Sequence, residues 1–138
     1  MKVYKCYFDG SCEPQNPGGT MGVGVFITSE DQEFRKSEHH QAKSENTNNI
    51  AEYLAFQMVL KLMQKKSDCL IKIYGDSKLV VMQMTGQWKI KEGAYVPYAR
   101  EAKLLLEDLR KNNSIIINWI PREENREADN QSKAHLKQ

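Results

Sequence analysis

An aromatic, apolar run that ends in an aspartate constrains the fold of this chain more than any other feature. The run covers Lys5–Ser11, and a stretch rich in proline and glycine follows it over residues 14–19. This pattern predicts a buried strand whose C-terminal end carries Asp9 beside a turn. A carboxylate at the mouth of a central strand is costly to desolvate, so it needs a cation or hydrogen-bond donors.

Three further acidic residues lie in similar settings: Glu52, Asp76 and Asp129. Asp76 directly follows a second apolar run, and in α/β sheets ligands gather beyond the carboxyl ends of the strands, where Asp9 and Asp76 are expected. Glu52 alone has another explanation, because an anion in the first turns of a helix interacts favourably with the helix dipole. We predict that the chain folds so as to bring the four carboxylates together.

The rest of the chain alternates strand and helix patterns. Glycines dot the second strand, which indicates that other backbone packs closely against it, and the charged third strand suits an exposed edge. Together the patterns predict an α/β protein with a five-stranded mixed sheet and helices on both faces. The expected strands are 5–11, 20–28, 33–41, 69–75 and 115–120, and the expected helices are 50–66, 78–84, one starting at Pro97, and 128–136.

Length and composition predict a single domain over residues 1–138. The net charge of +2 does not by itself indicate nucleic acid, although a local basic patch is compatible with it. No apolar run approaches the roughly 20 residues that span a bilayer, and the first residues do not form a secretory signal, so no membrane partner is expected. Three cysteines without a CxxC spacing argue against a disulfide framework or zinc site and fit a reducing, cytoplasmic location.

Four short motifs follow one another along essentially the whole chain. They are Phe8-Asp9-Gly10-Ser11-Cys12 with Asn16-Pro17-Gly18-Gly19, then Thr47-Asn48-Asn49 with Ala51-Glu52, then Tyr74-Gly75-Asp76-Ser77, and last Trp119-Ile120-Pro121 with Asn125 and Ala128-Asp129. Each is weak alone, but together, in this order and spacing, they resemble the motifs of type 1 ribonuclease H.

This resemblance implies an endonuclease that cuts the RNA strand of RNA–DNA hybrids with two Mg²⁺ ions, leaving a 5′-phosphate and a 3′-hydroxyl. Hard carboxylate ligands suit Mg²⁺, with Mn²⁺ as a substitute. By family analogy Asp9 bridges both ions and Asp129 holds the ion that activates water. Glu52 and Asp76 hold the ion at the leaving oxygen, and Glu52 also touches the 2′-hydroxyl. We expect a monomer.

The resemblance also implies contacts to the hybrid. The first turn and the asparagine run would contact the minor groove, and Thr47 would contact a DNA phosphate. The alternative is local, with the asparagines capping the helix and Cys12 filling a turn. The implied minor-groove residues are Ser11, Cys12, Asn16, Asn48 and Asn49.

Two departures from the better-known family members set this chain apart. The loop 121–127 lacks their histidine, and Arg122 and Glu124 are the candidates to replace it, while His135 lies beyond Asp129. A long basic insertion is also missing, and Trp88, Lys89 and Lys91 are its expected remnant in substrate binding. The alternative is that Trp88 is buried against the following helix with the lysines solvated.

Two other functions share this fold. One is a nucleic-acid-binding module without catalysis, which the four acidic positions disfavour. The other is a DNA-cutting integrase or resolvase core, which the Thr47-Asn48-Asn49 and Asn16-Pro17-Gly18-Gly19 elements disfavour. A structural protein would have no use for strand-end carboxylates.

Overall fold

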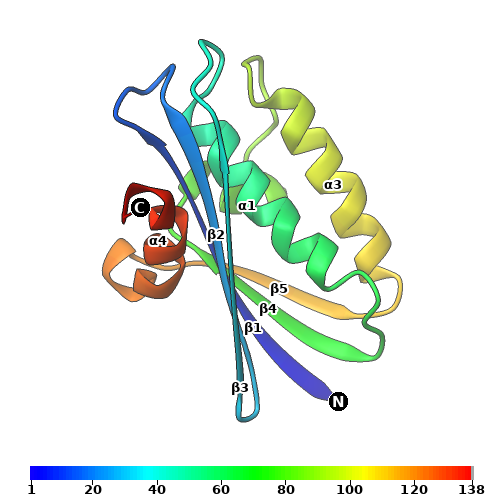
Figure 1. Ribbon diagram of the computed structural model, residues 1–138. Helices are drawn as coiled ribbons and strands as arrows, with labels where there is room; N and C mark the ends of the chain where they lie inside the picture. The colour runs from blue at the N-terminus through cyan, green and yellow to red at the C-terminus, as the bar shows by residue number, and fades with distance from the viewer. Residues whose placement is uncertain (138) are drawn as a thin grey trace.

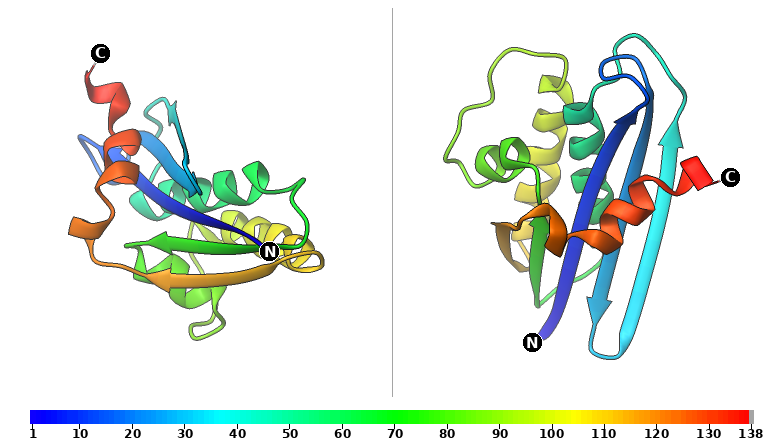
Figure 2. Two further views of the ribbon diagram at one scale, coloured as in Figure 1. Left: turned by 90° about the horizontal axis from the view of Figure 1, so that it is seen from below. Right: turned by 90° about the vertical axis from the view of Figure 1, so that its left-hand side faces the viewer.

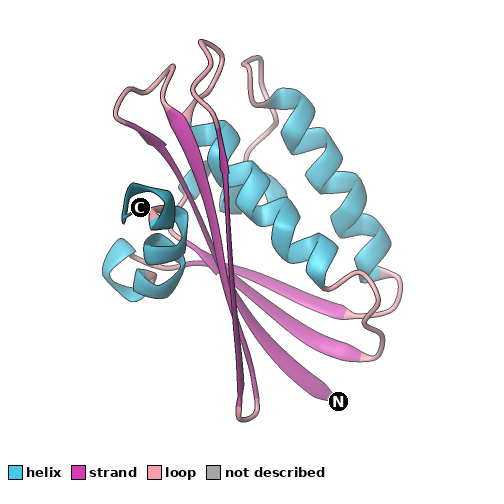
Figure 3. Ribbon diagram, viewed as in Figure 1, coloured by secondary structure: helices cyan, strands magenta, loops and turns pink. Residues whose placement is uncertain are grey.

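A computed structural model describes residues 1–137 of the chain (Figure 1). Figure 3 shows the same ribbon by secondary structure. Within residues 1–137 no helix has the length and apolarity to cross a membrane. The strands are β1 (Lys2–Glu13), β2 (Thr20–Ser29), β3 (Gln32–His40), β4 (Cys69–Gly75) and β5 (Ser114–Trp119), and the helices are α1 (Asn48–Leu62), α2 (Lys78–Met84), α3 (Val96–Arg110), η1 (Arg122–Glu124), α4 (Arg126–Ser132) and η2 (Ala134–Lys137).

The five strands form one mixed sheet in the order β3-β2-β1-β4-β5. The β1–β2 and β2–β3 pairs are antiparallel, and the β1–β4 and β4–β5 pairs are parallel. All residues of β3 are exposed, as its polar sequence predicts for an edge. The predicted mixed sheet is therefore confirmed.

The position of Asp9 within its strand differs from the prediction. The parallel pairing of β1 with β4 stops at the pair Phe8–Gly75, but the antiparallel pairing with β2 continues from Asp9 to Glu13. Asp9 therefore lies inside β1, at the point where β4 has ended and the sheet opens. The prediction that Asp9 ends its strand was wrong, because β2 keeps supplying backbone partners up to Glu13.

Helices cover both faces of the sheet. α1 and α3 pack together on one face, and the right-hand view of Figure 2 shows α4 in front of the opposite face. The apolar core lies between the sheet and α1, α2 and α3, and Phe8, Phe56 and Ile73 in it are fully buried. This two-sided arrangement lets both α1 and α4 reach β1.

Glycines in the central strands allow these close approaches. A Cβ on Gly22 would lie 1.6 Å from the Ser132 carbonyl oxygen, and one on Gly24 would lie 2.3 Å from the Ser132 nitrogen. The predicted close backbone packing against the second strand is thus confirmed, and α4 is the segment that makes it. Gly10 has the same role toward α1, since a Cβ there would lie 2.2 Å from the Ala51 carbonyl carbon.

Two helices end earlier than predicted. α1 stops at Leu62 rather than Lys66, because the exposed residues Gln64 and Lys65 have no apolar face to bury. The C-terminal helix begins at Arg126 and breaks after Ser132, where a short 3₁₀ turn follows. The Ser132 hydroxyl lies 2.8 Å from the Asp129 carbonyl oxygen, and such back-bonding by serine competes with the helical pattern.

Candidate active site

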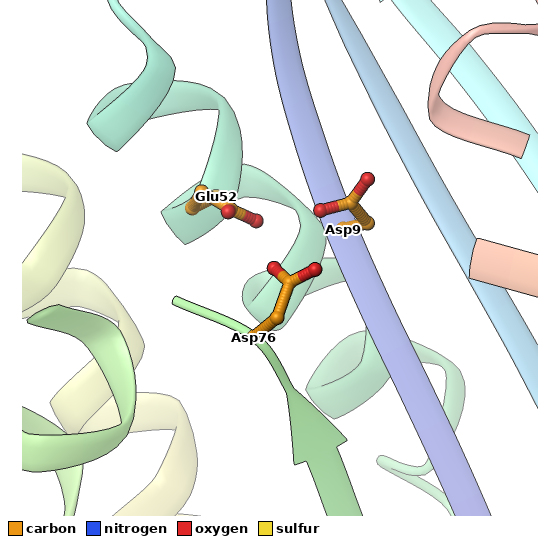
Figure 4. A group of neighbouring side chains, drawn as sticks. All are labelled: Asp9, Glu52 and Asp76. Carbon is orange, nitrogen blue, oxygen red and sulfur yellow. The ribbon is translucent and has the colours of Figure 1, made fainter. Parts of the chain in front are cut away.

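Three carboxylates from three different elements converge on one cleft (Figure 4). Asp9 comes from β1, Glu52 from the second turn of α1, and Asp76 from the residue after β4. Each offers a carboxylate oxygen, and these three oxygens lie within 4.8 Å of one another. The cleft has a volume of about 470 Å³.

Glu52 is held by the strand it faces. Its Oε1 accepts a hydrogen bond of 2.7 Å from the Gly10 backbone N–H, and only 5% of the residue is exposed. A solvated anion that merely complements the helix dipole would not be buried against β1. The alternative explanation of Glu52 by the helix dipole alone is therefore wrong.

The other two carboxylates also have fixed surroundings. Ser132 Oγ on α4 lies 3.0 Å from Asp9 Oδ2, within hydrogen-bond distance. The backbone on either side of Asp76 is held by β5, where the Trp119 indole N–H donates to the Asp76 carbonyl oxygen (3.1 Å) and the Ile120 N–H donates to the Gly75 carbonyl oxygen (2.9 Å). The cluster is thus preorganised by α1, α4 and β5.

Crowding of the three carboxylates changes their acidity. Burial, followed by the charge of Asp76, raises the pKa of Asp9 to about 8. Burial and the charge of Asp9 raise the pKa of Glu52 well above its ordinary value, and burial raises the pKa of Asp76. Three such groups cannot all be ionised together unless a cation balances their charge, and without a cation they retain protons.

A divalent cation fits this donor set. Carboxylate oxygens are the ligands that Mg²⁺ prefers, at about 2.0–2.1 Å, so two ligands of one ion lie at most about 4.2 Å apart. The three oxygens, which lie within 4.8 Å of one another, are close to that separation. Asp9, Glu52 and Asp76 together could therefore hold a hard divalent ion.

The raised pKa of Asp9 predicts a pH-dependent stability. Asp9 titrates near 3.9 in an unfolded chain and at about 8 in the fold, so the folded state binds the extra proton between these values. In EDTA the free energy of unfolding should therefore fall as pH rises from about 4 to 8, by up to about 1.4 kcal/mol per pH unit from this group. Thermal unfolding followed by circular dichroism measures this. Mg²⁺ should flatten the decline, and Asp9→Asn should reduce it; equal slopes in all three cases would contradict the assignment.

Asp129 lies on the same cleft but is held by cations. Its Oδ1 is 3.2 Å from Lys133 Nζ and 3.8 Å from an Arg122 guanidinium nitrogen. Lys133 also lies 3.9 Å from Glu13 Oε1. The structure therefore brings the fourth predicted carboxylate to the cleft wall, while Asp9, Glu52 and Asp76 form the tight cluster.

Several predicted hybrid contacts surround this cleft. Ser11, Cys12 and Asn48 line it together with the carboxylates. Asn16 lies in the preceding turn, and its Oδ1 accepts a 3.0 Å hydrogen bond from the Asn48 N–H. Asn49 is exposed beside them.

Local roles account for part of this group. The Thr47 hydroxyl oxygen caps α1 by accepting from the Ile50 N–H (3.1 Å), so the residue that caps the helix is Thr47 and not an asparagine. The Cys12 thiol, near the end of β1, lies 3.1 Å from the Gln15 carbonyl oxygen, so it contacts the following turn as well as the cleft. Their contacts to a substrate remain predictions.

The remaining predicted residues lie apart from the carboxylates. Trp88 and Lys89 line a separate groove against α3, and Lys91 is exposed in the same loop. Trp88 is 47% exposed, so the alternative that it is buried against α3 was wrong. Arg122 reaches the carboxylate cleft, whereas Glu124 lines a hollow beside Tyr7.

The predicted set of site residues did not contain three that shape the site. Lys133 and Ser132 follow Asp129 by four and three residues, a helical spacing that returns side chains to the same face. The third is the Trp119 indole, which fixes the Asp76 backbone and also has Lys78 Nζ 5.0 Å above its ring. Helical spacing could have indicated the first two, but the Trp119 contact joins residues 43 apart and needed the fold.

Comparison with solved structures identifies the fold class of this protein. The fold is that of ribonuclease H, with TM-scores of 0.79 to LC11-RNase H1 in complex with an RNA/DNA hybrid and 0.78 to RNase H1 of the halophilic archaeon Halobacterium salinarum NRC-1. The first is 29% identical and the match covers 93% of this chain and 92% of that one. The second is 28% identical, with 99% of each chain covered. The resemblance to type 1 ribonuclease H is confirmed.

A family model described as "Reverse transcriptase-like" matches residues 7–135, and the chain belongs to this family. Among curated relatives, the chain is 34% identical over 114 residues to the bifunctional protein Rv2228c of Mycobacterium tuberculosis (strain ATCC 25618 / H37Rv). That match covers 83% of this chain but 30% of Rv2228c. The chain thus corresponds to less than a third of that relative's length.

Proposed function

We propose that this chain is a ribonuclease H that hydrolyses the RNA strand of RNA–DNA hybrids with two Mg²⁺ ions and leaves 5′-phosphate and 3′-hydroxyl ends. The observation that carries the proposal is the cluster of Asp9, Glu52 and Asp76, whose oxygens lie within 4.8 Å of one another. The similarity to an RNase H1 solved with an RNA/DNA hybrid supports the choice of substrate.

Different residues of the cleft would bind the two metal ions and the phosphate. Glu52 and Asp76 would hold one ion and Asp129 the other, with Asp9 contributing to both. The ions would supply Lewis-acid stabilisation of the phosphate and an activated water. Lys133 and Arg122 orient Asp129 through the contacts described above, and Arg122, 70% exposed at its side chain, would bind a phosphate oxygen in place of the family's loop histidine.

One assay tests this proposal against its alternatives. Labelled RNA–DNA hybrid, duplex DNA and duplex RNA are incubated with the protein in Mg²⁺ or in EDTA, and the ends of the products are mapped. Cleavage of the hybrid's RNA strand alone, and in Mg²⁺ alone, is the expected result. Binding without cleavage would favour the non-catalytic module, and cleavage of duplex DNA would favour a resolvase-like enzyme.

Recognition of several 2′-hydroxyls predicts a preference for runs of ribonucleotides. Asn48 lines the cleft, Asn16 accepts a hydrogen bond from the Asn48 N–H, and Asn49 is the next residue; the three would contact successive nucleotides of the minor groove. A duplex with one ribonucleotide should therefore be cut poorly and one with several consecutive ribonucleotides well, as measured by initial rates. Equal rates on both duplexes would contradict the minor-groove contact.

The lysines beside Trp88 predict a change in substrate affinity. If Lys89 and Lys91 contact phosphates, changing both to alanine should raise KM with kcat nearly unchanged, because the contact is equal in the ground and transition states. The salt dependence of binding should fall by up to about two counterions. A double variant that keeps the wild-type KM across a salt series would place this loop outside the substrate channel.

A further inference from the structure

A basic groove lies on the side of α2 away from the carboxylates. It has a volume of about 670 Å³ and is bounded by the end of α2, the loop after it and α3. Its walls carry four cations, Lys89, Arg100, Lys103 and Arg110, against one acid, Glu107. Within residues 1–137 none of these four cations forms an ion pair with a carboxylate.

The cations of α3 gather in the groove more than its acids do. Glu101 pairs with Lys61 (4.0 Å) and Asp108 pairs with Lys111 (3.6 Å), whereas the groove receives Arg100, Lys103 and Arg110 with the single acid Glu107. Arg100, Lys103 and Arg110 recur at spacings of three and seven residues, which places them along one stripe about 15 Å long. The cations of this stripe repel one another, and an extended polyanion bound along it would relieve that repulsion.

The exposed indole of Trp88 lies beside this stripe, on a loop whose backbone is held by hydrogen bonds. Trp88 is 47% exposed, yet its backbone N–H donates to the Met82 carbonyl oxygen (3.0 Å). Gln83, only 6% exposed, donates to the Lys89 carbonyl oxygen (3.0 Å) and to Tyr95 Oη (3.0 Å). The fold therefore fixes the backbone that carries an exposed aromatic side chain, and this side chain offers a stacking surface to a ligand.

We propose that this groove binds single-stranded nucleic acid that continues beyond the hybrid, with a base stacked on Trp88 and phosphates bound by Arg100, Lys103 and Arg110 of the α3 stripe. An aromatic platform in a cationic groove is the combination that binds unpaired strands. Bases inside a duplex are already stacked on one another, whereas an unpaired base has a free face to stack on the indole. This inference rests on the proposed function, since it takes the hybrid to occupy the carboxylate cleft.

The path from the cleft to the groove is short. Asp76 lies two residues before α2, which has seven residues and a length of about 10 Å, and the groove begins where α2 ends. The end of the hybrid that runs along α2 would therefore point toward the groove, and an unpaired extension of that end is the strand that would reach Trp88.

The test compares hybrids with and without an unpaired DNA extension. Affinities are measured by fluorescence anisotropy in the Asp9→Asn background, which leaves the substrate uncut. We expect the extension to tighten binding by about three- to tenfold, because stacking of one base on the indole outweighs the cost of ordering the strand. Changing Arg100, Lys103 and Arg110 to glutamine should remove that gain and leave the affinity for the blunt hybrid unchanged. Trp88→Ala should reduce the gain as well.

A matched control removes three cations elsewhere. Lys5, Lys65 and Lys111 are exposed outside the groove, and their change to glutamine should preserve the gain. The proposal is overturned if the extension adds no affinity, if the control loses the gain equally, or if the α3 variant weakens blunt hybrid as much as extended hybrid. The last result would assign the groove to the duplex channel.

A second measurement does not depend on cleavage. In a Trp119→Phe variant Trp88 is the remaining tryptophan, and a single-stranded thymidine oligomer should quench its fluorescence in a salt-dependent way. If the oligomer quenches Trp88 but the wild type does not cleave hybrid, the proposed ribonuclease H function is wrong and the proposed single-strand binding by the groove stands. If the wild type cleaves hybrid but the oligomer does not quench Trp88, the proposed function stands and the proposal for the groove is wrong.

Discussion

Asp9→Asn should abolish hybrid hydrolysis and leave the fold intact. We expect a loss of about 100-fold or more in kcat, which corresponds to roughly 2.7 kcal/mol of transition-state stabilisation, because Asp9 is the proposed ligand common to both ions. Asparagine keeps a carbonyl oxygen that accepts from Ser132. Single-turnover cleavage of a labelled hybrid in Mg²⁺ measures the change, and a rate within about tenfold of wild type would overturn the ligand assignment.

The same substitution should stabilise the protein in EDTA. Asparagine carries no charge, so it avoids the penalty of keeping Asp9 protonated or charged among Glu52 and Asp76. At pH 7 we expect a gain of about 1 kcal/mol or more in the free energy of unfolding. Asp31→Asn, in the exposed β2–β3 turn, makes the same chemical change away from the cleft and should alter neither activity nor stability. Equal effects of the two substitutions would rule out a special environment at Asp9.

Gly10→Ala should damage both fold and site through a single methyl group. The added Cβ would lie 2.2 Å from the Ala51 carbonyl carbon and 2.4 Å from the Glu52 nitrogen, so the backbone of α1 has to move away from β1. Overpacking a core costs about 1–3 kcal/mol, and a main-chain obstacle cannot swing aside as a side chain does. We expect a fall in Tm of about 10 °C or more by circular dichroism. Separation of Glu52 from Gly10 should also weaken stabilisation of the protein by Mg²⁺.

Gly86→Ala is the matched control for this change. A Cβ at Gly86 meets nothing within 4 Å, but the residue has a φ of +81°, so the substitution carries only a conformational cost of about 1–2 kcal/mol. Gly10→Ala should therefore be the more damaging of the two and the one that changes the response to Mg²⁺. If the two variants unfold at the same temperature, close packing of α1 on Gly10 does not limit stability.

The sequence alone determined the architecture, because the architecture rests on local patterns. The apolar runs, the glycines of β2 and the helical spacings in α1 and α3 are each set by neighbours in the chain, and all lead to the observed mixed sheet. The order and spacing of Asp9, Glu52, Asp76 and Asp129 likewise identified the family and the candidate carboxylates. The bounds of α1 and α4 were less accurate, since exposed polar residues and a serine side chain ended them.

Tertiary packing alone decided how the site is built. Asp9 lies inside β1 rather than at its end because the pairing of β1 with β4 stops at Phe8 whereas its pairing with β2 continues to Glu13, and this depends on register. The Gly10–Glu52 hydrogen bond and the Trp119–Asp76 hydrogen bond join residues 42 and 43 positions apart, which periodicity cannot reveal. The exposure of Trp88 and the grouping of its neighbouring cations with α3 also followed from packing, because a local pattern shows which residues are charged but not which helix lies across from them.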